Sequence, residues 1–156
     1  MNAIAERFAG QGVGSIFLYT NEAHPGEHYP HHTSMAQKFR HAQALRDIYN
    51  VTRPILVDAL EGDCHIAYGS MPNMTWIFNQ RGIPIYKSDW TDTYSVEQAL
   101  RYFVEETPAR RRAGARLAPF RVERMEYRHQ DREAFYRGLE RSGPKAVEEF
   151  RAAMGE

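Results

Sequence analysis

The order of short apolar runs and amphipathic stripes is the feature that most constrains the fold. Apolar runs rich in β-forming residues predict four strands, at residues 15–19, 54–60, 74–79 and 83–87. Helical periodicity predicts helices at residues 2–9, 34–49 and 95–106, with a turn and short helix at 61–70. Strands that alternate with helices at this spacing predict an α/β fold. We expect a mainly parallel sheet with helices on both faces and an antiparallel edge hairpin at 74–87.

The character of the chain changes after residue 107. Residues 108–118 are rich in Arg, Ala and Gly and predict an irregular, exposed segment, and residues 119–127 could be extended. Two further helices are predicted at 131–141 and 144–154, separated by Ser142, Gly143 and Pro144. We therefore expect one domain over residues 1–107, followed over 108–156 by a linker and a helical C-terminal extension.

Charge and composition exclude several classes of protein. The 156 residues carry 20 Lys and Arg against 20 Asp and Glu, which argues against a nucleic-acid binder or an anionic-membrane binder. Apolar runs are far shorter than the roughly 20 residues of a membrane helix. Glu6 and Arg7 stand where a signal peptide would be apolar. Cys64 is the only cysteine, which excludes an internal disulfide. We expect a cytoplasmic protein.

Residues 21–33 form a predicted loop that is crowded with ionisable groups. Glu22 and His24 follow a predicted strand, at the edge where α/β proteins bind ligands. A carboxylate beside an imidazole orients the ring and raises its basicity, which suits proton transfer. Four imidazoles lie within nine residues and could hold zinc or another divalent metal: His24, His28, His31 and His32. The alternatives are that the loop is a solvated polar segment and that the protein holds no cofactor.

Several short motifs, in order and spacing, resemble those of one known group of proteins. They are Tyr19-Thr-Asn-Glu22-Ala23-His24-Pro25, His32-Thr-Ser34-Met35, Ile55-Leu-Val-Asp58 and Ala67-Tyr68-Gly69-Ser-Met71-Pro72, followed by the strand at 74–78 and Gly82. Over about residues 1–104 the chain resembles the thioredoxin-like superfamily, in its iodothyronine-deiodinase-like and peroxiredoxin-like (redoxin) branch. The segment 108–156 resembles tails of bacterial deiodinase-like proteins more loosely.

The resemblance implies a thioredoxin-like fold and thiol-redox chemistry, of reductive or dehalogenase type. Glu22, His24 and His32 would form a proton relay near the nucleophile, and His32 could bind a substrate oxyanion or phenol. Pro72 matches the cis-proline that exposes the backbone of residue Met71 to substrate, and Trp90 would rim the ligand site.

Cys64 has two interpretations. It lies before Pro72 on a segment that faces the active-site thiol in thioredoxin-like proteins, so it could be a relocated nucleophile activated by His65. The alternative, which we favour, is an incidental cysteine without a catalytic role.

One departure from the family pattern bears on both fold and function. The family has a strand and a Cys or selenocysteine loop before the first helix, whereas here Met1 falls within that helix. The absent strand would lie between residues 15–19 and 74–79, where unpaired backbone groups cost about 1–3 kcal/mol each. An upstream segment, residues 119–127, direct pairing of the neighbouring strands or a partner chain could fill the gap.

We expect a homo-oligomer or a hetero-complex to supply this strand, because Arg121, Glu123, Arg124 and Glu126 make 119–127 too charged for a central strand. The alternative function is then a non-catalytic subunit that binds or completes a partner protein.

Overall fold

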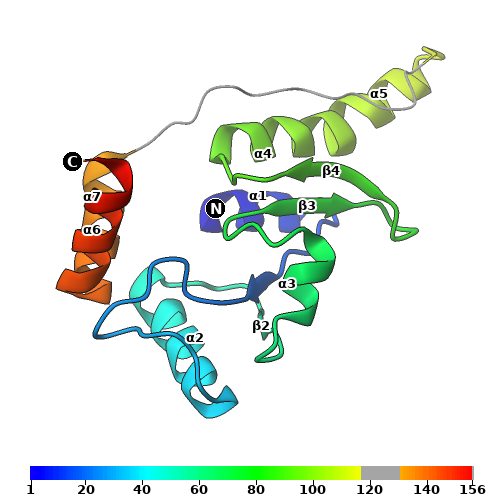
Figure 1. The fold of residues 1–156 in the computed structure, drawn as a ribbon. Coiled ribbons are helices and arrows are strands. Elements are labelled where there is room, and N and C mark those ends of the chain that lie inside the picture. The colour runs from blue at the N-terminus through cyan, green and yellow to red at the C-terminus, as the bar shows by residue number, and fades with distance from the viewer. Residues whose placement is uncertain (117–130, 156) are drawn as a thin grey trace. The chain divides into compact units, whose positions relative to one another are not determined.

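The computed structural model describes residues 1–116 and 131–155, which form two compact units (Figure 1). Unit 1 contains residues 1–15 and 73–116, and unit 2 contains residues 16–72 and 131–155. The chain therefore passes from unit 1 into unit 2 and back. The sequence-based boundary at residue 107 stays a prediction.

Unit 1 packs helices against an antiparallel hairpin. Its elements are α1 (Asn2–Ala9), β3 (Thr75–Phe78), β4 (Pro84–Ser88), α4 (Thr93–Leu100), a π-helical turn (Arg101–Glu106) and α5 (Thr107–Arg112). Phe8, Val96 and Leu100 form its buried core, against which Ile77 and Tyr86 of the hairpin pack. This core explains the i, i+4 apolar spacing that predicts α1.

Local hydrogen bonds define where the elements of unit 1 begin and turn. The carboxylate of Asp92 accepts from the backbone N of Ser95 at 2.9 Å and caps α4. The side chain of Asn79 accepts from the backbone N of Arg81 at 2.9 Å and of Ile83 at 3.0 Å. These bonds close the turn between β3 and β4, so the predicted antiparallel hairpin is confirmed.

Unit 2 contains a short parallel sheet and four helices. Its elements are β1 (Phe17–Tyr19), α2 (Met35–Tyr49), β2 (Ile55–Val57), α3 (Asp63–Tyr68), α6 (Arg132–Ser142) and α7 (Pro144–Met154). β1 and β2 pair in parallel, with Phe17 opposite Ile55 and Tyr19 opposite Val57. The crossover between them runs through the loop at 21–33 and then α2.

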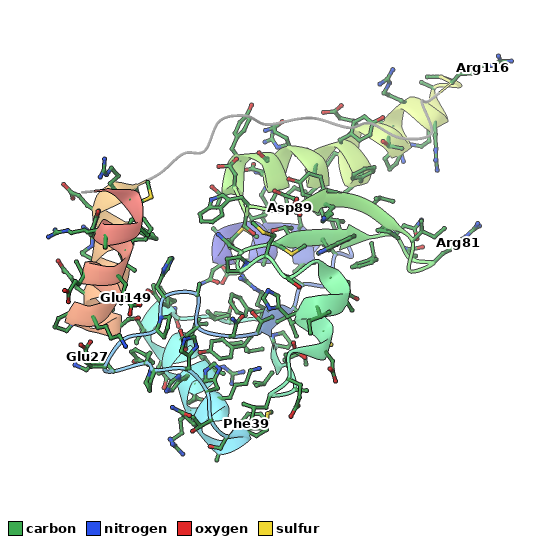
Figure 2. All side chains as sticks on the ribbon, viewed as in Figure 1. Glu27, Phe39, Arg81, Asp89, Arg116 and Glu149 are labelled. Atoms are coloured by element: carbon green, nitrogen blue, oxygen red, sulfur yellow. The ribbon has the colours of Figure 1, made fainter. Side chains whose placement is uncertain are left out.

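The buried face of α2 differs from the apolar stripe that predicts this helix, which consists of Met35, Phe39, Ala42, Leu45 and Ile48. Ser34 caps the helix as predicted, because its hydroxyl accepts from the backbone N of Gln37 at 3.3 Å. The buried residues are Lys38, His41 and Ala42, whereas Phe39 is 57% exposed and stands on the outer side of α2 (Figure 2). Two of the three are polar, so α2 directs ionisable groups into unit 2.

The structure confirms the mixed α/β class and corrects three details. The described strands form two separate two-stranded sheets rather than one, and a thioredoxin-like arrangement of them stays a prediction. The prediction that residues 108–118 are irregular is wrong for residues 108–112, which belong to helix α5. The chain stays helical through Pro108, although Pro108 has no N–H to donate, because the wider π-helical turn precedes it. All peptide bonds between described residues are trans, so the expected cis form of Pro72 is wrong.

The two predicted C-terminal helices are confirmed as α6 and α7, separated at Gly143, whereas their role as an extension outside the domain stays a prediction. The possible extended segment at 119–127 lies outside the described residues. Among the helices of residues 1–116 and 131–155, we find none with the length and apolarity that a bilayer span requires.

Candidate functional site

Ionisable side chains gather where β1 and β2 end. Tyr19 is the last residue of β1, and Asp58 directly follows β2. The backbone N of Asp58 donates to the carbonyl of Tyr19 at 3.0 Å, which joins the two strand ends. Glu22 follows three residues after Tyr19. The carboxyl ends of parallel strands are where α/β folds place ligand sites.

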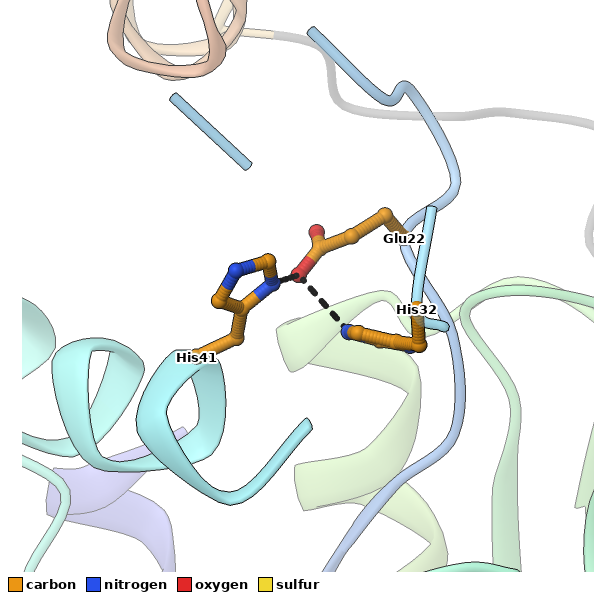
Figure 3. A group of neighbouring side chains, drawn as sticks. All are labelled: Glu22, His32 and His41. Atoms are coloured by element: carbon orange, nitrogen blue, oxygen red, sulfur yellow. Dashed lines mark hydrogen bonds and ion pairs between the residues drawn. The ribbon is translucent and has the colours of Figure 1, made fainter. Parts of the chain in front are cut away.

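Glu22 is the centre of a cluster with two imidazoles (Figure 3). Its Oε1 lies 3.2 Å from Nδ1 of His41 and 3.6 Å from Nε2 of His32. The hydroxyl of Tyr19 donates to the same Oε1 and lies 3.5 Å from Nε2 of His32. The side chains of His32 and His41 are only 4% and 10% exposed, and that of Glu22 is 19% exposed. A partly solvated carboxylate thus contacts a phenol and two imidazoles, all of them largely buried.

Burial and neighbouring charges set the protonation of this cluster. Burial, with the hydrogen bond to the Glu22 carboxylate, raises the pKa of Tyr19 well above its usual value, so Tyr19 remains a proton donor. Burial lowers the pKa of His32, and the nearby Glu22 carboxylate only partly opposes this effect. His41 and Lys38 act in the same direction as burial. His32 therefore favours its neutral form.

A second charged pair lies at the same sheet edge. Lys38 is 1% exposed, and its Nζ donates to the carbonyl of Ala59 at 2.7 Å. The Asp58 carboxylate is 3% exposed and accepts from the backbone N of Ala59, Cys64 and His65, at 2.8 to 3.1 Å. Burial raises the pKa of Asp58, but these three bonds and the Lys38 charge outweigh it, so the pKa is lowered. Burial lowers the pKa of Lys38.

The loop at 21–33 is fastened to the hairpin of α6 and α7. The backbone N of His28 donates to the carbonyl of Ser142 at 2.9 Å, and Nδ1 of His28 lies 3.0 Å from the carbonyl of Arg141. A Cβ on Gly26 would lie 2.1 Å from the Ser142 carbonyl oxygen. Only glycine permits this approach, so the sequence at position 26 is fixed by the contact.

The loop at 21–33 also caps helix α7. The carboxylate of Glu27 accepts from the backbone N of Lys145 at 3.1 and 3.2 Å, at the N-terminus of α7 (Figure 2). Gly143 has a φ of +121°, and a Cβ there would lie 2.0 Å from Oε2 of Glu27. The C-terminal hairpin thus holds the segment between Glu22 and His32 in place.

The four loop histidines lie in different surroundings. His24 packs edge-on against Phe135 of α6 and Phe150 of α7, at centroid distances of 5.7 and 5.4 Å. His28 contacts the end of α6, and His31 is exposed. Of the four, the structure brings His32 to Glu22, and it places His24 with the aromatic rings. Burial lowers the pKa of His24.

The remaining sequence-derived candidates do not join this cluster. Cys64 is exposed near the start of α3. Met71 and Pro72 are exposed in unit 2, and the Met71 carbonyl lies 3.0 Å from Nε2 of His65. Trp90 belongs to unit 1, where it forms an isolated bridge with Asn73.

Sequence reasoning missed His41 and Tyr19. The sequence did contain a signal for His41, because it lies three residues after Lys38 and directly before Ala42. Residues three apart lie on one face of a helix, so Lys38 and His41 define a polar face. That face was an alternative to the apolar stripe as the buried side of α2. Tyr19 was expected as the end of a buried strand, and its hydroxyl needs a buried partner, which the adjacent Glu22 supplies.

No protein-family model, curated protein or solved structure matches the chain.

Proposed function

We propose that Tyr19, Glu22, His32 and His41 form the acid–base centre of a thiol-redox protein with a thioredoxin-like, deiodinase- or peroxiredoxin-like fold. The observation that carries the proposal is the Glu22 carboxylate, which is shared by a phenol and two imidazoles at the carboxyl end of β1. The resemblance of the motifs around Glu22 and His32 to that family supports the same assignment.

The chemistry needs groups that accept a proton from a thiol and return it to a leaving group. In peroxide reduction, a thiolate attacks the O–O bond, and the alkoxide that leaves takes up the proton. The resulting sulfenic acid condenses with a second thiol, which gives a disulfide and water. A buried imidazole oriented by a carboxylate suits both transfers. We assign the thiols to a dithiol reductant rather than to Cys64, which does not join the cluster of Glu22, His32 and His41.

Replacing Glu22 with glutamine should lower the rate of thiol-dependent reduction by about 10²- to 10⁴-fold, because proton transfer by a positioned group contributes that much. The assay measures reduction of an organic hydroperoxide or an aryl iodide by dithiothreitol with the full chain. His32→Ala should lose activity to a similar extent.

His31→Ala is the matched control, because His31 is the exposed neighbour of His32. It should keep the wild-type rate, as should Cys64→Ser. The proposal is contradicted if the wild-type protein reduces neither substrate, or if Glu22→Gln and His31→Ala behave alike.

A partner chain is the second part of the proposal. Unit 2 exposes ten of its large apolar side chains: Ile16, Phe39, Ile48, Tyr49, Leu56, Leu60, Ile66, Tyr68, Met71 and Met154. Leu56, in the middle of β2, is 50% exposed. Exposed apolar side chains are the groups that an interaction partner covers. We propose that a homo-oligomer or a hetero-complex covers Leu56 and other exposed apolar side chains of unit 2, and in the non-catalytic alternative this binding is the function.

Sedimentation of the full chain should show an oligomer whose population rises with protein concentration. Leu56→Glu, which places a charge on the exposed face of β2, should shift that equilibrium to monomer. A wild-type chain that stays monomeric and soluble across the concentration range would contradict the homo-oligomer. Capture of no partner by the immobilised chain would then contradict the hetero-complex.

A further inference from the structure

We propose that Glu22, His32 and His41 form a binding site for a divalent cation of the Zn²⁺ type. The three residues come from the loop at 21–33 and from α2 (Figure 3). One ligand atom from each lies within 4.8 Å of the other two. The inference uses the cluster of the proposed acid–base centre but does not depend on any redox activity.

The two ligand-atom distances from Glu22 fit a tetrahedral ion. Zinc bonds to imidazole N and carboxylate O of about 2.0–2.2 Å place neighbouring ligands about 3.3–3.5 Å apart in a tetrahedron. Oε1 of Glu22 lies 3.2 Å from Nδ1 of His41 and 3.6 Å from Nε2 of His32. An octahedral Mg²⁺ site would need cis ligands only about 2.9 Å apart. The observed distances therefore fit the tetrahedral case better.

The ligand types point to the same class of ion. Two imidazoles and one carboxylate suit Zn²⁺ and its neighbours among the first-row transition metals, whereas Mg²⁺ and Ca²⁺ favour sites made of oxygen ligands. Three protein ligands leave a fourth position for water or another ligand. The hydroxyl of Tyr19, 3.5 Å from Nε2 of His32, borders the ligand set.

The surroundings hold the ligands in orientation. Tyr19 donates to the Glu22 carboxylate, and the Tyr29 ring packs edge-on against His41 at a centroid distance of 5.1 Å. Groups that orient ligands in this way affect metal affinity by about 10- to 100-fold. Coordination through Nδ1 requires the His41 tautomer that carries its proton on Nε2.

A bound ion would change what the centre can do. It would occupy the lone pairs of both imidazoles and the Glu22 oxygen that accepts from Tyr19. These are the groups that the proposed proton transfers use, so the metal would inhibit thiol-dependent reduction. The site would then be a regulatory one.

Cobalt(II) is the probe for the test, because tetrahedral Co²⁺ absorbs visible light far more strongly than octahedral aqueous Co²⁺. Titration of the metal-stripped full chain should give one intense visible band at one equivalent, and one equivalent of Zn²⁺ should remove it. His32→Ala, His41→Ala and Glu22→Gln should each abolish the band. Tyr19→Phe should weaken binding by about 10- to 100-fold without abolishing it.

His31→Ala and His24→Ala are the matched controls and should bind Co²⁺ as the wild type does. Circular dichroism of each variant serves to check that it is folded. The site is overturned if the wild-type spectrum stays that of aqueous Co²⁺, or if the controls lose the band together with His32→Ala. The hydroperoxide assay is run on the metal-stripped wild-type chain, so metal binding and redox activity can fail separately.

Discussion

Replacing Asp58 with alanine should lower the free energy of unfolding by about 3–5 kcal/mol, the usual cost of leaving a buried charge uncompensated. The variant removes the acceptor of three backbone N–H groups, which belong to Ala59, Cys64 and His65. It also removes the negative charge that acts most strongly on the buried ammonium of Lys38. Both losses occur at the edge that carries the candidate site, so α3 and the end of β2 should loosen together.

Two other variants separate the contributions to this effect. Asp47→Ala removes an exposed carboxylate of α2 that accepts from Gln43, and should change the stability by less than about 0.5 kcal/mol. Lys38→Met removes the ammonium but keeps the three hydrogen bonds to Asp58. It should therefore cost less than Asp58→Ala. Urea unfolding followed by circular dichroism measures all three.

The stabilisation that Asp58 gives to the folded chain should decrease at acid pH. The pKa of Asp58 is lower in the folded chain than in the unfolded chain, where it is about 3.9. Its stabilising contribution is therefore complete above about pH 5 and is lost as the pH falls towards the folded pKa. The difference between wild type and Asp58→Ala should be constant near neutral pH and should shrink in acid. A difference that grows in acid would contradict this account.

Local sequence signals predicted the elements well because their causes are local. Ser34 begins α2 through its own hydroxyl, and the tail helices divide at Gly143 and Pro144, as the sequence indicated. The hairpin between β3 and β4 follows from the turn at Asn79. Boundaries differed by one to three residues where strand ends depend on pairing.

The buried face of α2 could not be predicted in this way, because its partners are distant in the sequence. An apolar stripe selects Phe39 and Ile48, yet both are exposed. Lys38 is buried against Asp58 and Ala59 of the segment after β2, and His41 is buried against Glu22 of the loop after β1. Periodicity counts apolar residues and cannot assign a polar side chain to a partner that only the fold supplies.

The candidate site likewise combines contacts that the sequence indicated with contacts that only the fold supplies. The family resemblance implied that Glu22 and His32 act together near a nucleophile, and the structure brings these two side chains together. His24 was expected beside Glu22 because it is close in sequence. The aromatic rings of Phe135 and Phe150 surround it instead, and these rings come from helices more than 100 residues further along the chain.

Replacing Phe8 with alanine should be the most damaging change in unit 1 and should cost about 3–5 kcal/mol. Phe8 is fully buried and is the largest side chain of a small cluster with Val96 and Leu100. Its loss removes apolar contacts and leaves a cavity that the neighbours fill only in part. Both tryptophans, Trp76 and Trp90, lie in unit 1, so their fluorescence during urea unfolding reports on this unit.

Phe78→Ala is the matched control, because Phe78 is the same residue type in the same unit but is 42% exposed. It stacks on Trp76 at a centroid distance of 6.1 Å and should cost much less than Phe8. The comparison isolates burial, since both variants remove the same atoms. Equal losses would show that the cluster around Phe8 does not hold unit 1 together. A large loss in Phe8→Ala alone would show that α1 (Asn2–Ala9), although far from α4 (Thr93–Leu100) in the sequence, is part of the same core.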